Sequence, residues 1–309
     1  MKTILIIAFL IILMPDSSHL QPVFKSNTQG MLRARDEVEK INTKIEYFYI
    51  NEVSDSICSL FSKEFTYLPE FKPIITNIDD LRTFFRDWFK AVTVKAYKKN
   101  IYEVQEISGY ILETGTFNLQ YSTPLNTNAE YSGKYMVMWN RNPTGKLSIL
   151  TEIFGSDKGI NPEDMPYATV KVKANTFLDR NTVGKKVQPE IEEYDKGVVK
   201  AVLDGDGNAR ANGFTTDGIY MPHFDKMQIG MDAIKPYMLH TYKPGVFTYV
   251  IDTYHEVFDT GDFVFLNCAF NVGSNRSAQT GGFTGNMSNL MKRGKDGKLL
   301  MYRQLAHNN

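Results

Sequence analysis

The sequence contains an internal repeat in which positions 153 residues apart carry matching side chains. Residues 67–71 read Tyr-Leu-Pro-Glu-Phe, and residues 220–224 read Tyr-Met-Pro-His-Phe. The same offset relates Phe61 to Phe214, and near the C-terminus an offset of 152 relates two Gly-Lys-Leu segments. An offset that holds over roughly 100 residues is typical of a tandem duplication, which requires the chain to fold as two similar units.

Both copies carry a helical pattern first and strand patterns after it. Apolar side chains at steps of three and four predict amphipathic helices over residues 38–49 and 191–203. Alternating, β-rich stretches predict strands over residues 110–117 and 263–270. Helices followed by antiparallel strands indicate an α+β fold, with the helices packed on one face of each sheet. Between the copies, alternation over residues 167–173 predicts one extra strand.

The chain divides into four segments. An apolar run over residues 4–14 follows Lys2, contains no charge and ends in polar residues. The run is shorter than the roughly 20 apolar residues of a membrane span, and its positive start and polar exit are typical of a secretory signal peptide. We expect a secreted or periplasmic mature protein, with an uncleaved anchor as the alternative. The predicted segments are a signal peptide (1–20), a first domain (31–156), a linker (157–187) and a second domain (188–307).

Composition and charge exclude several classes of protein. The 35 basic residues balance the 35 acidic residues, so the chain lacks the field that would hold nucleic acid, and no nucleic-acid partner is expected. The two cysteines, Cys58 and Cys268, cannot form a disulfide framework. We expect two separate buried thiols, although export would permit a disulfide between them. Neither a Ser/His/Asp nucleophile motif nor a phosphate-binding glycine loop occurs in the sequence, and no cofactor is predicted.

Four segments of the second copy resemble the nuclear-transport-factor-2-like superfamily, within it the SnoaL-like and ketosteroid-isomerase-like branch. They are residues 214–222, 230–234, 261–264 and 291–299. The first copy keeps the Tyr-Leu-Pro segment and a Trp-Asn-Arg-Asn-Pro-Thr-Gly-Lys-Leu segment that begins at Trp139. The resemblance implies two cone-shaped domains, each a strongly curved antiparallel sheet wrapped around helices, with a largely apolar pocket at the wide end. It also implies that the two copies pair through their sheets as an internal pseudo-dimer.

The acid pair that ketosteroid-isomerase-like enzymes use is absent from both copies. The family places a general-base aspartate near the proline that follows the first strand, where this sequence has Leu68 and Met221. The second acid, which the family carries on a later strand, would stand near Val137 and Asn289, and neither of these residues is acidic. Proton abstraction by that arrangement is therefore not expected.

Three other titratable residues are candidates for catalysis. Glu152 shares an alternating row with Leu150 and Phe154, where desolvation would raise the pKa of its carboxyl and suit it to general acid or base catalysis. His223 lies in the repeated Pro-His-Phe segment, and His255 lies in an alternating, mostly apolar row of a predicted strand. A neutral imidazole in an apolar cleft is able to move a proton near neutral pH. Packed or solvent-facing side chains are the alternative for all three.

Further side chains are expected to contact a ligand, and no metal site is predicted. Because Gln304 stands where the first copy has Glu152, the two pockets differ chemically. No close-spaced pair of metal ligands accompanies His223. The candidate ligand-binding residues are Tyr67, Trp139, Tyr220, Tyr302 and Gln304.

Three hypotheses about function follow from the sequence. The preferred one is a protein that binds a small hydrophobic molecule in a cone-shaped pocket. The first alternative is an isomerase, cyclase or dehydratase acting on a carbonyl-bearing lipid or polyketide-like molecule. The second alternative is an interaction or oligomerisation module, because one fold serves several functions.

Overall fold

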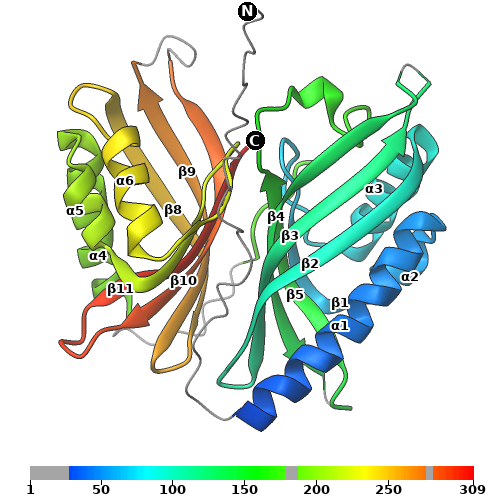
Figure 1. Ribbon diagram of the computed structural model, residues 1–309, viewed down its shortest axis with the longest axis horizontal. Helices are drawn as coiled ribbons and strands as arrows, with labels where there is room; N and C mark the ends of the chain where they lie inside the picture. Colours follow the sequence, from blue (N-terminus) through cyan, green and yellow to red (C-terminus); the bar gives the residue numbers. More distant parts are fainter. Residues whose placement is uncertain (1–27, 125, 143, 179–186, 276–280) are drawn as a thin grey trace, which may run out of the picture.

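The structure, a computed structural model, contains two mixed sheets that face each other, with helices on their outer sides (Figure 1). It describes residues 28–124, 126–142, 144–178, 187–275 and 281–309, so the predicted signal peptide lies outside the described residues. The α+β prediction is confirmed. We call residues 28–156 the first unit and residues 187–308 the second unit.

The two units have the same order of elements, except that the second has an additional short strand, β7, before its third helix. The first unit contains α1 (Thr28–Ile50), α2 (Ser54–Cys58), β1 (Phe61–Leu68), α3 (Ile78–Ala91), β2 (Thr93–Ile107), β3 (Tyr110–Ser122), β4 (Ala129–Arg141) and β5 (Leu147–Ser156). A short 3-10 helix, η1 (Pro162–Asp164), follows it. The second unit contains α4 (Val187–Asp204), α5 (Gly207–Asn212), β6 (Phe214–Met221), β7 (Gln228–Ile229), α6 (Met231–Thr241), β8 (Phe247–Asp259), β9 (Phe263–Ser274), β10 (Phe283–Arg293) and β11 (Leu299–Asn308).

Most strand pairs are antiparallel, but one pair in each sheet is parallel. The sheets have the orders β1-β5-β4-β3-β2 and β7-β6-β11-β10-β9-β8. The parallel pairs are β1 with β5 and β6 with β11. Parallel neighbours need a long crossover connection, and the rest of each unit, including α3 or α6, supplies it. Alternation along a strand predicts which faces are apolar but does not predict strand direction.

Helix α3 shows how the sequence closes the first unit. The side chain of Asn77 accepts a hydrogen bond of 2.8 Å from the backbone N–H of Asp80 and so caps the helix start. The apolar face of the helix, which includes Phe85 and Trp88, is buried. Phe85 packs 5.8 Å from the ring of Tyr67 on β1, so the helix covers the interior of the sheet.

The predicted extra strand over residues 167–173 is absent, and this prediction was wrong. The segment has turn and irregular backbone instead. Tyr167 is buried and packs edge-on at 5.1 Å from the ring of Trp88. The carbonyl of Ala168 accepts a hydrogen bond of 2.8 Å from the ammonium of Lys72, so a side chain rather than a neighbouring strand satisfies the backbone here.

β-Bulges decide which side chains of the last strands face the unit interiors. In β5 the register shifts at Leu150, and in β11 it shifts at Tyr302. Each bulge reverses the alternation of the strand, so Leu150 and Tyr302 pack between the two sheets. The predicted row was therefore wrong at Leu150, whereas Phe154 belongs to the interior core of the first unit.

The two sheets share one apolar core. It contains buried side chains from both units, and each contributes aliphatic and methionine residues. Its members are Leu68, Ile74, Ile107, Leu112, Met136, Met138, Leu150 and Ile153 from the first unit, and Ile219, Met221, Phe258, Phe265, Leu290, Tyr302 and Leu305 from the second. Burial of this much apolar area stabilises the contact between the sheets.

Buried polar contacts also join the sheets. Arg303 of β11 binds Glu103 of β2 through two hydrogen bonds of 2.7 and 2.8 Å, and both side chains are buried. Glu256 of β8 accepts hydrogen bonds of 2.6 Å from the hydroxyl of Thr66 and 2.5 Å from the amide of Asn267. Paired, charge-assisted contacts of this kind fix one register between the two faces.

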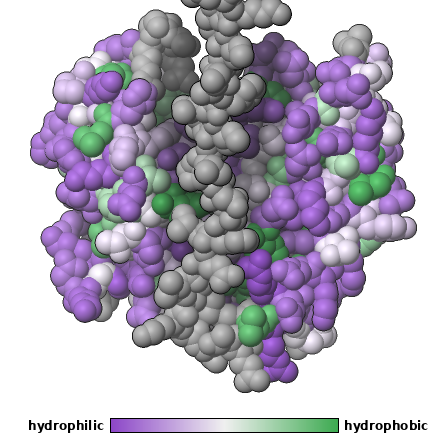
Figure 2. Space-filling model, in the orientation of Figure 1, coloured by the Kyte–Doolittle hydropathy of each residue, from purple (hydrophilic) through white to green (hydrophobic). Residues whose placement is uncertain are grey.

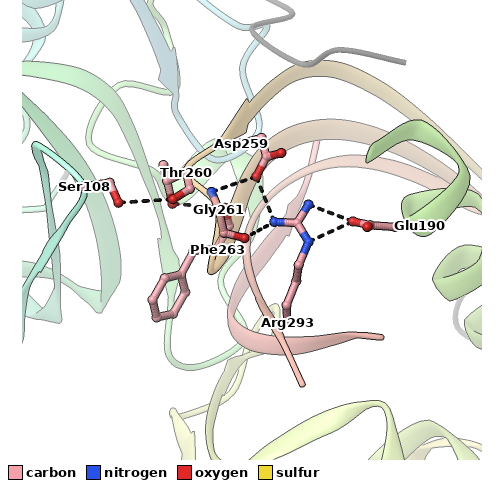
Figure 3. Close-up of polar contacts among 7 residues, drawn as sticks. All are labelled: Ser108, Glu190, Asp259, Thr260, Gly261, Phe263 and Arg293. Atoms are coloured by element: carbon pink, nitrogen blue, oxygen red, sulfur yellow. Dashed lines mark hydrogen bonds and ion pairs between the residues drawn. The ribbon is translucent and has the colours of Figure 1, made fainter. Parts of the chain in front are cut away.

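At one end of the sheets, Arg293 forms ion pairs with helix α4 and with the hairpin that follows β8 (Figure 3). The guanidinium of Arg293 lies 2.7 Å from the carboxylate of Glu190 on α4 and 2.8 Å from that of Asp259 at the end of β8. From the first unit, the hydroxyl of Ser108 donates a hydrogen bond of 3.2 Å to the carbonyl of Thr260 in the same hairpin.

The surface of the units is largely polar, and the cysteines are internal. Figure 2 shows hydrophilic residues over most of the two flanks. Within the described ranges, none of the helices has the length and apolar composition to cross a membrane.

Cys58 and Cys268 are both buried free thiols, as expected from the sequence.

We predict that Arg303→Met destabilises the chain by about 3–5 kcal/mol, because it leaves Glu103 buried without its cationic partner. The double variant Glu103→Met/Arg303→Met should lose less, because it leaves no buried charge unpaired. Urea unfolding curves measure both values. Arg82→Met is the control, since it removes only exposed ion pairs, with Asp55 and Asp79, and should cost much less than Arg303→Met. A single variant no weaker than this control would contradict the prediction.

Candidate functional site

The second unit encloses a cavity of about 350 Å³. Side chains of its helices and of five strands line the cavity. The wall is mostly aliphatic and aromatic, and includes Tyr220, Tyr237, Val250, Phe270, Phe283 and Met287. Its volume lies within the range of about 300–1,000 Å³ that small-molecule sites occupy.

One cation, Arg210 of α5, lies on the cavity wall. The helix begins at an Asp206 cap, whose carboxylate accepts a hydrogen bond of 2.9 Å from the backbone N–H of Ala209. Arg210 is only 5% exposed, and its Nη2 donates a hydrogen bond of 2.9 Å to the amide oxygen of Gln304. Its Nε and Nη1 make no hydrogen bond of standard geometry in the described part of the chain, and the hydroxyls of Tyr194 and Tyr242 are the neutral groups near them. The guanidinium carbon lies 4.9 Å from the ring centroid of Phe214, a cation–π distance.

Asp252 of β8 also lines the cavity. Burial, together with the neighbouring carboxylate of Asp195, raises the pKa of Asp252 to about 7, and the charge of Arg210 acts in the opposite direction. Asp195 is held in place by Tyr254, whose hydroxyl donates a hydrogen bond of 2.7 Å to it. The cavity therefore contains a carboxyl group that exchanges its proton near neutral pH.

His223 lies where the cavity meets the first unit. Its ring lines the cavity, and its Nε2 lies 3.0 Å from a carboxylate oxygen of Glu70, an ion pair when the imidazole is protonated. Glu70 also accepts hydrogen bonds of 2.8 Å from the hydroxyls of Tyr131 and Ser156. Burial alone would raise the pKa of Glu70, but the contacts with His223 and the backbone N–H of Ser156 lower it overall. His223 therefore contacts both the cavity and the junction between the units.

His255 and Tyr302 do not line this cavity. A bulge between Tyr254 and Glu256 shifts the alternation of β8. The ring of His255 stacks on Phe177 at 4.3 Å, outside the cavity wall. Tyr302 lies in the core between the sheets, with the guanidinium of Arg303 3.5 Å from its ring centroid. The alternating rows assumed from the sequence did not include either bulge.

The interior of the first unit is nearly filled. Its cavity measures about 20 Å³, close to the space of one water molecule, and Glu152 lines it. Burial raises the pKa of Glu152, the charge of Lys99 lowers it and that of Glu113 raises it, so the pKa lies above its usual value. Trp139 is buried and donates a hydrogen bond of 2.9 Å to Glu113, whereas Tyr67 packs among aromatic side chains of the core.

Of the five candidate ligand-binding residues, Tyr220 and Gln304 line the second unit's cavity, and Tyr67, Trp139 and Tyr302 do not. Sequence analysis missed Arg210 and Asp252. The repeat indicates Arg210, because the 153-residue offset relates it to Ile57, a buried apolar residue. Where one copy has a charged residue and the other copy has a buried apolar residue at the equivalent position, the chemistry of the two units differs locally. Within the described ranges, no three His, Cys, Asp or Glu side chains gather as a metal site.

Comparison with known proteins gives structural similarities only. No family model matches the chain, and no curated protein matches it. A ketosteroid isomerase-like protein from Erwinia carotovora atroseptica is 16% identical, covers 40% of this chain and 98% of its own, and has a TM-score of 0.35. An NTF-2-like protein of unknown function from Shewanella oneidensis is 14% identical, covers 39% of this chain and 98% of its own, and has a TM-score of 0.33.

A Nostoc punctiforme domain of unknown function with a cystatin-like fold is 13% identical, covers 41% of this chain and 80% of its own, and has a TM-score of 0.35. These similarities concern the fold alone, so the chemistry of the two units must be argued from their own residues.

We predict that Asp252→Asn makes the chain relatively more stable as the pH rises. Because folding raises the pKa of Asp252 to about 7, its stabilising contribution is full below the unfolded value of about 4. That contribution is lost as the pH rises through 7. The asparagine cannot ionise, so the free energy of unfolding of the variant, relative to the parent, should improve by about 2–3 kcal/mol between pH 5 and pH 8.

Urea unfolding at pH 5, 6, 7 and 8 measures this difference. Asp232→Asn, at an exposed position of α6, is the matched control and should show no such trend. Parallel pH dependence of the parent and Asp252→Asn would contradict the prediction.

Proposed function

We propose that the chain is an exported protein whose second unit binds a small, largely apolar molecule. The observation that carries this proposal is the contrast between the two interiors, about 350 Å³ in the second unit and about 20 Å³ in the first. Aliphatic and aromatic side chains dominate the larger cavity, and a few polar groups lie on its wall. Natural sites for small apolar ligands have this composition.

In this proposal the first unit supports the second as the other half of an internal pseudo-dimer. Its sheet supplies half of the apolar core between the units. Its buried carboxylate Glu113 is already satisfied, because Asn42, Tyr135 and Trp139 donate hydrogen bonds of 2.6, 2.7 and 2.9 Å to it. A satisfied polar network in a filled interior favours a structural role. Export is proposed from the short apolar run that follows Lys2.

A second candidate function is proton-transfer catalysis in the same cavity, of isomerase, cyclase or dehydratase type on a carbonyl-bearing molecule. Asp252 favours it, because a carboxyl whose pKa is near 7 inside an apolar cavity has the property of a general acid or base. A binding protein and an enzyme differ in one respect here. Asp252→Asn would leave binding intact in both cases, but would abolish turnover in the enzyme.

We predict that filling the cavity abolishes uptake of an apolar molecule. Val250 lines the cavity, and its neighbour Ile251 points to the other side of β8 and is 56% exposed. Val250→Trp should weaken binding of the neutral fluorescent probe N-phenyl-1-naphthylamine by about tenfold or more, because the indole occupies the space of the probe. Ile251→Trp should leave the affinity within about twofold, because its indole lies in solvent.

Fluorescence titration of the purified chain measures both affinities, and circular dichroism checks that each variant folds. Native mass spectrometry of the parent adds an independent measurement, in which a co-purifying molecule is released on denaturation. A parent chain that neither retains a molecule nor takes up the probe saturably would refute the proposed function.

A further inference from the structure

We propose that the molecule held by the second unit carries an anionic group, a carboxylate, and that this group binds beside Arg210. The inference rests on the proposed function and specifies the class of ligand. It identifies the ligand as an amphipathic anion, with an apolar body in the aromatic part of the cavity and its charged end at α5.

The first argument is the absence of a direct ion pair. Arg303, which is buried, has Glu103 at 2.7 Å, and the half-buried Arg293 has Glu190 at 2.7 Å. Arg210 is buried, yet no carboxylate lies within 4.0 Å of it in the described part of the chain. Burial of a cation without an anionic partner is costly, and an anionic ligand in the adjoining cavity would remove that cost.

The second argument comes from the repeat. The position equivalent to Arg210 in the first unit is Ile57, which is buried, so the fold itself does not require a charge there. The position equivalent to Gln304 is Glu152. A glutamate at position 304 would neutralise Arg210 internally, but the glutamine offers only its amide oxygen, at 2.9 Å from Nη2. Arg210 therefore occurs in the unit that has the large cavity, and that unit has Gln304 at the position where the first unit has Glu152.

The polar groups around Arg210 are compatible with an anion. Phe214 and Tyr242 hold the guanidinium by cation–π contacts at 4.9 and 6.0 Å, which position it without neutralising it. Asp252 lines the same cavity, and its raised pKa of about 7 makes it partly protonated at neutral pH. In its protonated form, Asp252 is able to donate a hydrogen bond to a carboxylate instead of repelling it.

The test compares two ten-carbon probes with an anionic and a neutral head group, decanoate and decan-1-ol, by displacement of N-phenyl-1-naphthylamine from the parent chain at pH 7. Decanoate should bind about 10- to 100-fold more tightly, which is the range expected for a hydrogen bond to a charged group. Arg210→Met should remove this preference and leave the affinity for decan-1-ol within about threefold, whereas Arg210→Lys should retain part of it.

Gln304→Glu is an independent variant that keeps Arg210. It supplies the internal carboxylate, so it should abolish the preference for decanoate while binding of decan-1-ol persists. If Arg210→Met fails to fold, the two probes on the parent chain and on Gln304→Glu still decide the matter. Equal affinity of the parent for both probes, or displacement by neither, overturns the inference, while saturable uptake of the naphthylamine still supports the proposed function. Failure of all three molecules to bind overturns both.

Discussion

The contact between the two sheets is the interaction on which the rest of the structure depends. Each sheet presents an apolar face to the other, and an apolar patch of that kind left in water would favour aggregation. Because these faces cover each other, the opposite faces of the sheets are left for the helices and the interiors. The bidentate contact of Arg303 with Glu103 adds direction to an otherwise non-directional apolar contact.

The two units have similar folds but differ in how far side chains fill their interiors. In the first unit, aromatic side chains and the network around Glu113 leave almost no space. The second unit instead contains a cavity bordered by Arg210 and Asp252. In the proposed function, the filled first unit supports the second, and the cavity of the second unit holds the ligand.

Much of the fold could be predicted from the sequence, but the candidate site largely could not. The repeat and the periodicities predicted the order of helices and strands, because these patterns reflect local geometry and burial. Bulges at Leu150 and Tyr302 were not predictable, since a bulge depends on how a strand pairs with its neighbour rather than on alternation. The row of His255 was misplaced for the same reason. Arg210 lies on a short helix with no pattern of its own, and only the comparison of the copies marks it.

The pairing of His223 with Glu70 has a consequence for how the halves recognise each other. The 153-residue offset relates these two residues, so they occupy the same position in the two copies, and they meet 3.0 Å apart. Two identical chains that met in this way would place a residue against its own copy, carboxylate against carboxylate or imidazole against imidazole. Covalent linkage allows the two positions to differ, and an imidazole that faces the carboxylate avoids the like-charge contact that a second glutamate would bring. The chain thus encodes its own pairing selectivity, a property that a symmetric dimer of one repeat cannot have at this position.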